Sequence, residues 1–377
     1  MPSYSGVWTL QAQMQAVAAG TWTGIVELYS WGLNSSGELG LNDQANRSSP
    51  VQVGSFTNCS QNTSGVDFAV AIKTDGTMWS WGAAGAGRLG QNDAVYRSSP
   101  AQIGALTGWS KVVAGTAHSL AIKTNGTLWS WGANGAGQLG LGDDANRSSP
   151  VQVGSLTTWS QGAGGRYHSL AIKTDGTMWS WGNNNAGQLG LNDAVYRSSP
   201  VQVGALTTWS QVAAGFIHSL AIKTDGTMWS WGSGTSGQLG LNDAYSRSSP
   251  VQIGALTTWS KIAGGTNFSL AIKTDGTMWS WGINSNAQLG HNDTANRSSP
   301  VQIGSLTTWS QVAGGNTFSL ALKTDGTLWS WGNGGFGRLG LNDSNPRSSP
   351  VQVGALTTWL TLPRMPTANF SMVMKTS

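Results

Sequence analysis

The sequence predicts an all-β fold, a single seven-bladed β-propeller built from four-stranded antiparallel blades. The tetrapeptide WSWG, or its variant YSWG, recurs at a constant step of 50 residues, with its glycine at positions from Gly32 to Gly332. Self-similarity at a fixed period of roughly 20 to 50 residues is typical of solenoids and propellers. The chain also combines 53 Gly and 21 Trp with only 10% charged residues, which favours short buried strands joined by many turns over disorder.

One copy of the repeat contains four segments with strand composition. WSKVVAG ends at Gly115, HSLAIKT begins at His118, TLWSWG begins at Thr127 and RSSPVQVG begins at Arg147. The KTNGT segment between the second and third, which reads KTDGT in the other full copies, is a strong hairpin signal. Pro150 cannot donate a hydrogen bond to a sheet, so the fourth strand is expected at the outer edge of the blade.

The strands carry apolar or small residues on both faces. Leu120 and Ile122 point to one side, and Ala121 points to the other. A sheet with one face in water would alternate apolar with polar residues, so this pattern predicts blades that pack face to face around a ring. Trp129 and Trp131 share one face, and we expect these large rings in the core rather than on a ligand platform.

The two ends of the chain together contain the hairpin that the repeat otherwise lacks. We expect residues 1–32 and 360–377 to complete the closing blade, with Met372–Lys375 paired to Val26–Ser30, and residues 1–377 to form one domain. Such pairing removes two exposed sheet edges. The N-terminal stretch has neither a basic region nor a long apolar run, so we expect no signal peptide or membrane span. The compartment stays open between the cytoplasm and an assembled particle.

The segment GTAHSLAIKTNGTLWSWGANGAGQLGLGD, from Gly115 to Asp143, resembles the repeat of the regulator-of-chromosome-condensation family. The resemblance covers almost the whole chain and implies a seven-bladed propeller, but members range from exchange factors to photoreceptors to protein inhibitors. The exchange members act on a small GTPase partly through an inserted β-wedge, for which the constant 50-residue step leaves no room. The photoreceptor clusters Trp at positions that here read Thr116, Arg166, Phe216, Thr266 and Asn316. The inhibitors bind a protein with one face of the ring, and this sequence is compatible with that mode.

Sequence variation concentrates in loops that an antiparallel meander places on one face of the ring. The KTDGT hairpins and VGALTTW connections share the other face and scarcely change between copies. Aromatic and polar side chains interspersed with Gly and Ser resemble the chemistry of a binding surface. Drift at exposed loop tips is the alternative, and the contrast between the two faces favours binding. The candidate partner-binding residues are Tyr96, Arg166, Tyr167, Tyr196, Phe216, Ile217, Tyr245, Asn267, Asn316 and Phe336.

The candidate chemical groups have structural explanations. The position of His118 carries His in three copies and Phe in three others, which indicates a packing position rather than a metal ligand. The Asp of each ND pair, as at Asp143, is expected in an Asx turn with a local ion pair to Arg147, rather than in a calcium site. Cys59 stands where other copies carry Trp and is expected to be a buried thiol. We expect no metal and no cofactor.

These observations together predict a non-catalytic binding or scaffold propeller. Catalysis needs an asymmetric set of activated groups, which nearly identical blades do not supply. The partner is expected to be a protein or a surface glycan, with a bacterial surface or a viral particle as a candidate setting. Basic and acidic residues alternate within each copy, so a nucleic-acid partner is not expected. The alternatives are a guanine-nucleotide exchange regulator of a small GTPase and a purely structural decorating protein.

Overall fold

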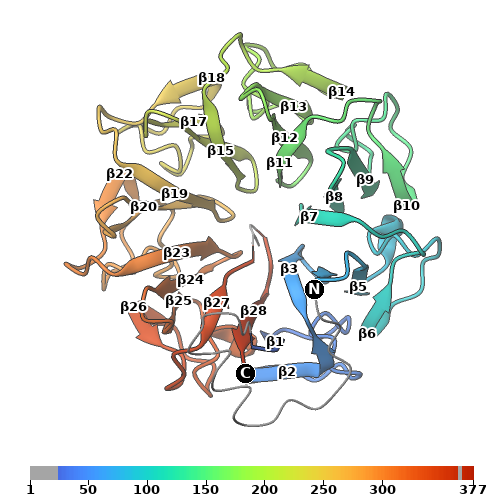
Figure 1. The fold of residues 1–377 in the computed structure, drawn as a ribbon. Helices are drawn as coiled ribbons and strands as arrows, with labels where there is room; N and C mark the ends of the chain where they lie inside the picture. Colours follow the sequence, from blue (N-terminus) through green and yellow to red (C-terminus); the bar gives the residue numbers. More distant parts are fainter. Residues whose placement is uncertain (1–23, 364–366) are drawn as a thin grey trace, which may run out of the picture.

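The protein forms a ring of seven four-stranded antiparallel sheets (Figure 1). The computed structural model describes residues 24–363 and 367–377, so most of the predicted N-terminal part of the closing blade, residues 1–23, lies outside the described residues. Within six of the seven blades the four strands are neighbours in chain order, as the hairpin signals predict. The predicted seven-bladed β-propeller is confirmed.

Six blades are formed by strands that follow one another in the sequence. From the inner to the outer strand, the first blade consists of β3 (Cys59–Ser64), β4 (Phe68–Lys73), β5 (Met78–Gly82) and β6 (Arg97–Gln102). The second blade consists of β7 (Trp109–Ala114), β8 (His118–Lys123), β9 (Leu128–Gly132) and β10 (Arg147–Gln152). The third blade consists of β11 (Trp159–Gly164), β12 (His168–Lys173), β13 (Met178–Gly182) and β14 (Arg197–Gln202). The fourth blade consists of β15 (Trp209–Ala214), β16 (His218–Lys223), β17 (Met228–Gly232) and β18 (Arg247–Gln252). The fifth blade consists of β19 (Trp259–Gly264), β20 (Phe268–Lys273), β21 (Met278–Gly282) and β22 (Arg297–Gln302). The sixth blade consists of β23 (Trp309–Gly314), β24 (Phe318–Lys323), β25 (Leu328–Gly332) and β26 (Arg347–Gln352).

The closing blade joins the two ends of the described chain. Its strands lie in the order β2 (Arg47–Thr57), β1 (Val26–Gly32), β28 (Phe370–Thr376) and β27 (Trp359–Thr361). β1 and β28 are antiparallel, and their register pairs Val26 with Thr376 and Ser30 with Met372. This is the predicted pairing, and it closes the ring without leaving a free strand edge between the termini.

The outer strand of each blade contains the proline that marks it as an edge strand. In β10 the register with β9 shifts between Arg147 and Val151, and Pro150 lies in this interval. The irregular interval leaves the proline nitrogen without a required ladder bond. The only helices among the described residues are the short 3-10 turns η1 (Gly85–Gly87) and η2 (Gly335–Gly337), and no described helix is long and apolar enough to cross a membrane.

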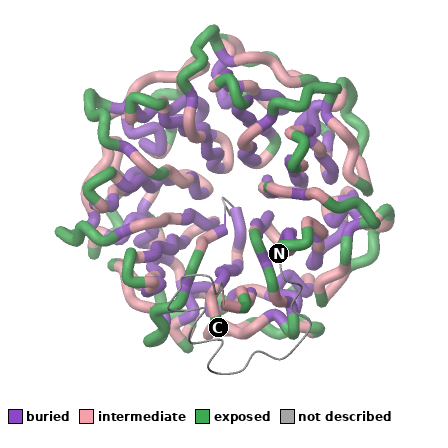
Figure 2. Tube along the Cα trace, in the orientation of Figure 1, coloured by how far each residue is buried: buried purple, intermediate pink, exposed green. Residues whose placement is uncertain are grey.

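Neighbouring blades are held together by the second tryptophan of each WSWG motif. Trp181 is fully buried, and its indole N–H donates to the carbonyl oxygen of Gln138 in the preceding blade at 2.9 Å. Gly140 beside it has φ +73°, and a Cβ there would lie 2.8 Å from the indole nitrogen of Trp181. The second glycine of the GQLG motif therefore permits the close approach of the blades. Figure 2 shows the buried positions along the strands and the exposed positions on the connecting loops.

The blade that carries Cys59 replaces the missing tryptophan in an unexpected way. Cys59 is buried, as predicted, and burial raises its pKa to about 12. The ring that packs on the WSWG tryptophans here comes from Phe56, which lies 5.7 Å from Trp79 and 5.9 Å from Trp81. The equivalent Leu106 in the next blade is 47% exposed, whereas Phe56 is buried. The two substitutions at 56 and 59 therefore compensate for each other.

Candidate protein-interaction surface

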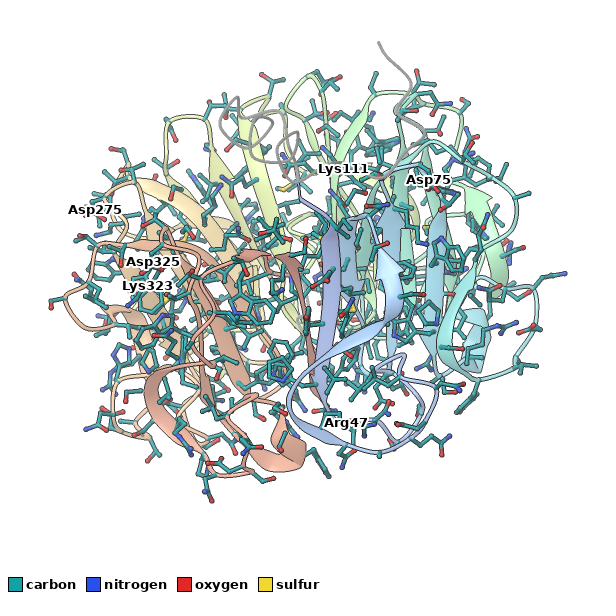
Figure 3. All side chains as sticks on the ribbon, turned by 60° about the horizontal axis from the view of Figure 1, so that its bottom comes forward. Arg47, Asp75, Lys111, Asp275, Lys323 and Asp325 are labelled. Carbon is teal, nitrogen blue, oxygen red and sulfur yellow. The ribbon has the colours of Figure 1, made fainter. Side chains whose placement is uncertain are left out.

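The two ends of the strands form two distinct surfaces. The Gly-x-x-His loops and the long loops after WSWG lie together on what we call the variable-loop face, since the amide of Ala133 donates to the carbonyl of Ala117 at 2.9 Å. The KTDGT hairpins and the ALTTW connections form the hairpin face, where the amide of Trp159 donates to the carbonyl of Gly126 at 3.1 Å. Figure 3 labels Asp75 of a hairpin and Arg47 at the end of a long loop on opposite sides of the disc.

Each long loop is fixed by a repeated polar network. The carboxylate of Asp143 accepts a hydrogen bond from the amide of Ala145 at 3.0 Å and pairs with Arg147 at 2.5 Å. Both contacts lower the pKa of Asp143. The side chain of Asn134 donates to the carbonyl of Asp143 at 2.8 Å and accepts from the amide of Leu139 at 2.9 Å. These are the Asx turn and the local ion pair that the sequence predicts.

Part of the variation in the long loops is structural. The amide of Asn134 donates to the side-chain oxygen of Asn146 at 2.8 Å, which closes the loop across its two ends. Asparagine pairs at the same two positions do so in two further blades, Asn34 with Asn46 and Asn284 with Asn296. Tyrosine occupies the last position at Tyr96, where the first residue is Ala84, and at Tyr196, where the first residue is Asn184. The donor is the backbone amide of the first residue, so the last residue of the window helps to close the loop in these three blades whatever the first side chain is.

The predicted aromatic residues of the long loops lie exposed on separate blades. Tyr96 is 57% exposed, Tyr196 50%, Tyr245 72% and Phe336 51%. The ring of Phe336 lies 5.4 Å from the guanidinium of Arg338. The structure shows no contact between these four aromatic side chains. They therefore lie apart, on four different blades of the variable-loop face.

Three of the predicted residues nearer the inner strands come together. The guanidinium of Arg166 lies 4.6 Å from the ring of Tyr167 and 4.7 Å from the ring of Phe216. The amide of Arg166 also donates to the carbonyl of Phe216 at 2.9 Å. We call these residues the Arg166 cluster. Positions separated by 50 residues meet because they occupy the same place in adjacent blades, and this spacing is the sequence signal that could have predicted the contact.

The remaining predicted residues serve the loop framework as well as the surface. The carbonyl oxygens of Ile217 and Asn267 accept from the amides of Ser233 and Ile283, each at 2.9 Å. The side chain of Asn316 accepts from the hydroxyl of Thr266 at 2.9 Å and donates to Asn369 at 3.0 Å. The amide group of the Asn316 side chain is thus engaged within the protein.

The recurring histidines occupy a packing position between blades. His118, His168 and His218 are fully buried, and their Nε2 atoms lie 2.9–3.2 Å from serine hydroxyls of the next blade. The hydroxyl of Ser169 donates to the carbonyl of Gln138, so it accepts from His118. Burial lowers the pKa values of the three histidines. Within the described residues, no group of three His, Cys, Asp or Glu side chains is placed to hold a metal.

The constancy of the hairpin face has a structural cause. Gly126 in the hairpin turn has φ +77°, and a Cβ there would lie 2.0 Å from the carbonyl oxygen of Thr157 in the connecting segment. The turn and the connection therefore constrain each other by direct backbone contact. The contrast in variability between the two faces does not by itself indicate binding, contrary to the interpretation from the sequence. The exposed aromatic chemistry on the variable-loop face is the stronger argument.

Residues of the inner strands β7, β11, β15, β19 and β23 line a cavity of about 570 Å³. Its lining consists largely of small residues, among them Ala163, Ala213, Ala263 and Gly314, together with polar side chains such as Lys261 and Gln311. The side chain of Gln311 donates to the carbonyl of Leu360 at 2.8 Å, so it links neighbouring inner strands. This lining offers little chemistry for holding a cofactor.

The chain is similar in sequence and in fold to proteins of one family. The model of the RCC1-like domain matches residues 5–260, and the regulator of chromosome condensation (RCC1) repeat matches residues 275–322 and 325–360. No curated protein matches the chain. Among solved structures, yeast RCC1 (Prp20) bound to Kap60 shares 21% identity with a TM-score of 0.84, covering 94% of this chain and 90% of that one.

Two further structures show the same fold. Prp20p from Saccharomyces cerevisiae, described with its binding properties to Gsp1p and histones, shares 22% identity with a TM-score of 0.83 and covers 94% of this chain and 92% of its own. Human WBSCR16 shares 21% identity with a TM-score of 0.84 and covers 93% and 99%. The repeat and the overall fold agree with these matches. The chain belongs to the family of RCC1-like domains.

Proposed function

We propose that this protein is a non-catalytic propeller that binds a protein partner through its variable-loop face. The observation that carries the proposal is the set of exposed aromatic side chains on this face, which water solvates poorly and which differ from blade to blade. Tyrosine offers a large contact area with few rotatable bonds and keeps a polar hydroxyl, so it suits a binding surface. The framework of paired Asp and Arg residues holds these loops in fixed positions.

The comparisons support a protein as the partner. Among the similar structures, yeast Prp20 is bound to Kap60 in one, and Prp20p is described with its binding properties to Gsp1p and histones in another. None of these similar structures is described with a glycan or on a particle surface, so we propose no role of that kind. Identity near 21% carries the fold and not the particular partner, which must be found by experiment.

Guanine-nucleotide exchange on a small GTPase is a second candidate, raised by the family resemblance and by the likeness to Prp20p. The exchange members act partly through an inserted wedge. The described blades keep a constant 50-residue step with no such insertion. Accelerated release of labelled nucleotide from a GTPase recovered with the protein would favour this role, and an unchanged release rate would exclude it for that GTPase.

The test is a capture experiment from the source lysate with two baits. One bait is the native chain. The other carries Tyr96→Asn and Tyr196→Asn, so that each new side chain can accept from the backbone amide of residue 84 or 184, as Asn146 accepts from the amide of Asn134. A protein captured by the native bait and lost from the second bait supports the proposal. Equal capture by both baits counts against it.

A further inference from the structure

Arg166 stands apart from the other arginines of the described chain. Seven arginines, from Arg47 to Arg347, pair with an aspartate four residues earlier at 2.5–2.7 Å. Arg88 pairs with Asp67, and Arg338 donates to the hydroxyl of Thr317 at 3.1 Å. Among residues 24–363 and 367–377, Arg166 is the arginine whose guanidinium has neither a hydrogen bond nor an ion pair in the structure.

The guanidinium of Arg166 is held in place without using its hydrogen-bond donors. The rings of Tyr167 and Phe216 lie 4.6 and 4.7 Å from its central carbon, and Arg166 itself is half-buried. Cation–π contacts engage the flat faces of the group and leave its N–H bonds free. Because the side chain is already ordered by the two rings, a ligand that pairs with it loses less conformational freedom on binding.

The chemistry of the cluster favours a carboxylate over a phosphate. Phosphate recognition in proteins usually recruits several cationic groups. The equivalent positions in other blades carry Thr116, Phe216, Thr266 and Asn316, which supply no further positive charge. A single planar guanidinium flanked by aromatic rings matches the two oxygens and the single charge of a carboxylate, which it can bind with two parallel hydrogen bonds.

We propose that the Arg166 cluster binds the carboxylate of an aspartate or glutamate on the protein partner. This inference rests on the proposed function, since it names the chemistry by which the partner is recognised on the variable-loop face. The pairing supplies the counter-charge that Arg166 lacks within its own chain. Tyr167, 38% exposed, lies beside the charged group and would contact the apolar part of the partner side chain.

The repeat itself supplies matched control variants. Arg166→Thr places there the residue found at position 116 and at position 266, in the same loop of two other blades. This variant therefore tests the charge with little risk to the fold. Arg166→Lys keeps the charge but loses the planar fork, and Phe216→Thr removes one of the two rings.

The first experiment uses small probes and the full chain. N-acetylglutamate methylamide, its glutamine analogue and its phosphoserine analogue are titrated while NMR follows the Arg166 Nε–H resonance, assigned by its loss in Arg166→Thr. We expect a saturable shift with the glutamate probe at a Kd at least about tenfold lower than with either analogue. No saturable shift, or an equal shift with the glutamine probe, overturns the inference. Tighter binding of the phosphoserine probe overturns it in favour of a phosphate ligand.

The second experiment separates this inference from the proposed function. The partner recovered with the native bait is titrated against the native chain, Arg166→Thr and Arg166→Lys. We expect at least about a tenfold loss of affinity for Arg166→Thr and an intermediate loss for Arg166→Lys. Undiminished affinity of Arg166→Thr, with binding still lost from the bait altered at Tyr96 and Tyr196, overturns the carboxylate assignment and leaves the proposed function standing. Undiminished affinity of both altered chains overturns both proposals.

Discussion

The buried histidines predict that the propeller loses stability in mild acid. Burial lowers the pKa values of His118, His168 and His218 to about 4, 3 and 4. In the unfolded chain a histidine titrates near pH 6.5. Between about pH 6.5 and pH 4 the unfolded chain therefore binds more protons than the folded chain, so the free energy of unfolding falls as the pH falls.

The size of the effect follows from these pKa values. Each pH unit within the window costs about 1.4 kcal/mol for each histidine that stays neutral in the folded state. From pH 7 to pH 5 the loss amounts to about 2 kcal/mol for one histidine and about 5 kcal/mol for three, since protonation of the unfolded chain is only half complete at pH 6.5. This is a large share of the roughly 5–15 kcal/mol that stabilises a typical domain.

The matched variant is His118→Phe, His168→Phe and His218→Phe together. Phenylalanine already occupies the same buried position at Phe68 and Phe268, so the replacement suits the blade. Urea unfolding followed by tryptophan fluorescence at pH 5, 6 and 7 gives the free energy of unfolding of both proteins. We expect the native protein to lose about 5 kcal/mol more than the variant between pH 7 and pH 5.

Other titrating groups do not obscure this comparison. Burial also lowers the pKa of His291, but this residue is present in both proteins and its contribution cancels in the difference. The aspartates with lowered pKa values, such as Asp143, lose their stabilising contribution only as the pH falls toward and below about 4. Parallel pH profiles for the two proteins would refute the argument from buried neutral imidazoles.

Three further changes test the packing of the ring by urea unfolding. Phe56→Leu should lower the free energy of unfolding by about 1–2 kcal/mol, and adding Cys59→Trp to it should restore most of this loss. If the losses of the two substitutions add instead, Phe56 does not compensate for the missing tryptophan at position 59. Burial raises the pKa of Glu38, so ionisation of its carboxyl destabilises the fold as the pH rises. Glu38→Gln should therefore raise the free energy of unfolding by about 1 kcal/mol at pH 7 and change it little at pH 4. An unchanged free energy of unfolding at pH 7 would contradict this expectation. Gly140→Ala should lower the free energy of unfolding by more than about 2 kcal/mol, because the new Cβ would contact the indole of Trp181. Its control, Gly142→Asn, restores the residue of most other blades and should change the free energy of unfolding by less than about 0.5 kcal/mol. Equal losses for the two variants would argue against the close approach of the blades at Gly140.

The strands and their order could be predicted from local patterns. The hairpin turn at Gly126 and the proline at Pro150 each fix a local backbone geometry, and the repeat contains the turn six times and the proline seven times. The closing pair of Val26 and Thr376 followed because the termini held complementary halves of one hairpin. These features depend on sequence neighbours or on the period alone.

The contacts between blades could not be predicted in the same way. The indole of Trp181 reaches the carbonyl of Gln138, 43 residues earlier, because the ring curvature brings the loop of one blade over the strand of the next. The packing of Phe56 in place of a tryptophan at position 59 depends on the path of the connection, which the alternation pattern does not encode. The face of the ring on which the candidate site lies could be predicted from the directions of the strands. The contacts of Arg166 with its neighbours could be predicted only by aligning the same loop of adjacent blades.

The most direct test of a variable-loop binding face compares two sets of substitutions, one on each face. One variant carries Arg166→Thr, Phe216→Thr and Tyr196→Asn, each a residue that another blade has at that position. The other carries Leu156→Gln and Leu206→Gln on the hairpin face, where both leucines are 46% exposed. Both are titrated against the captured partner, with native-like urea unfolding as the control for folding.

We expect a loss of affinity of about 100-fold or more for the variable-loop variant and less than about twofold for the hairpin-face variant. The reverse result, with affinity lost only when the leucines change, would place the partner on the hairpin face and contradict the proposed function.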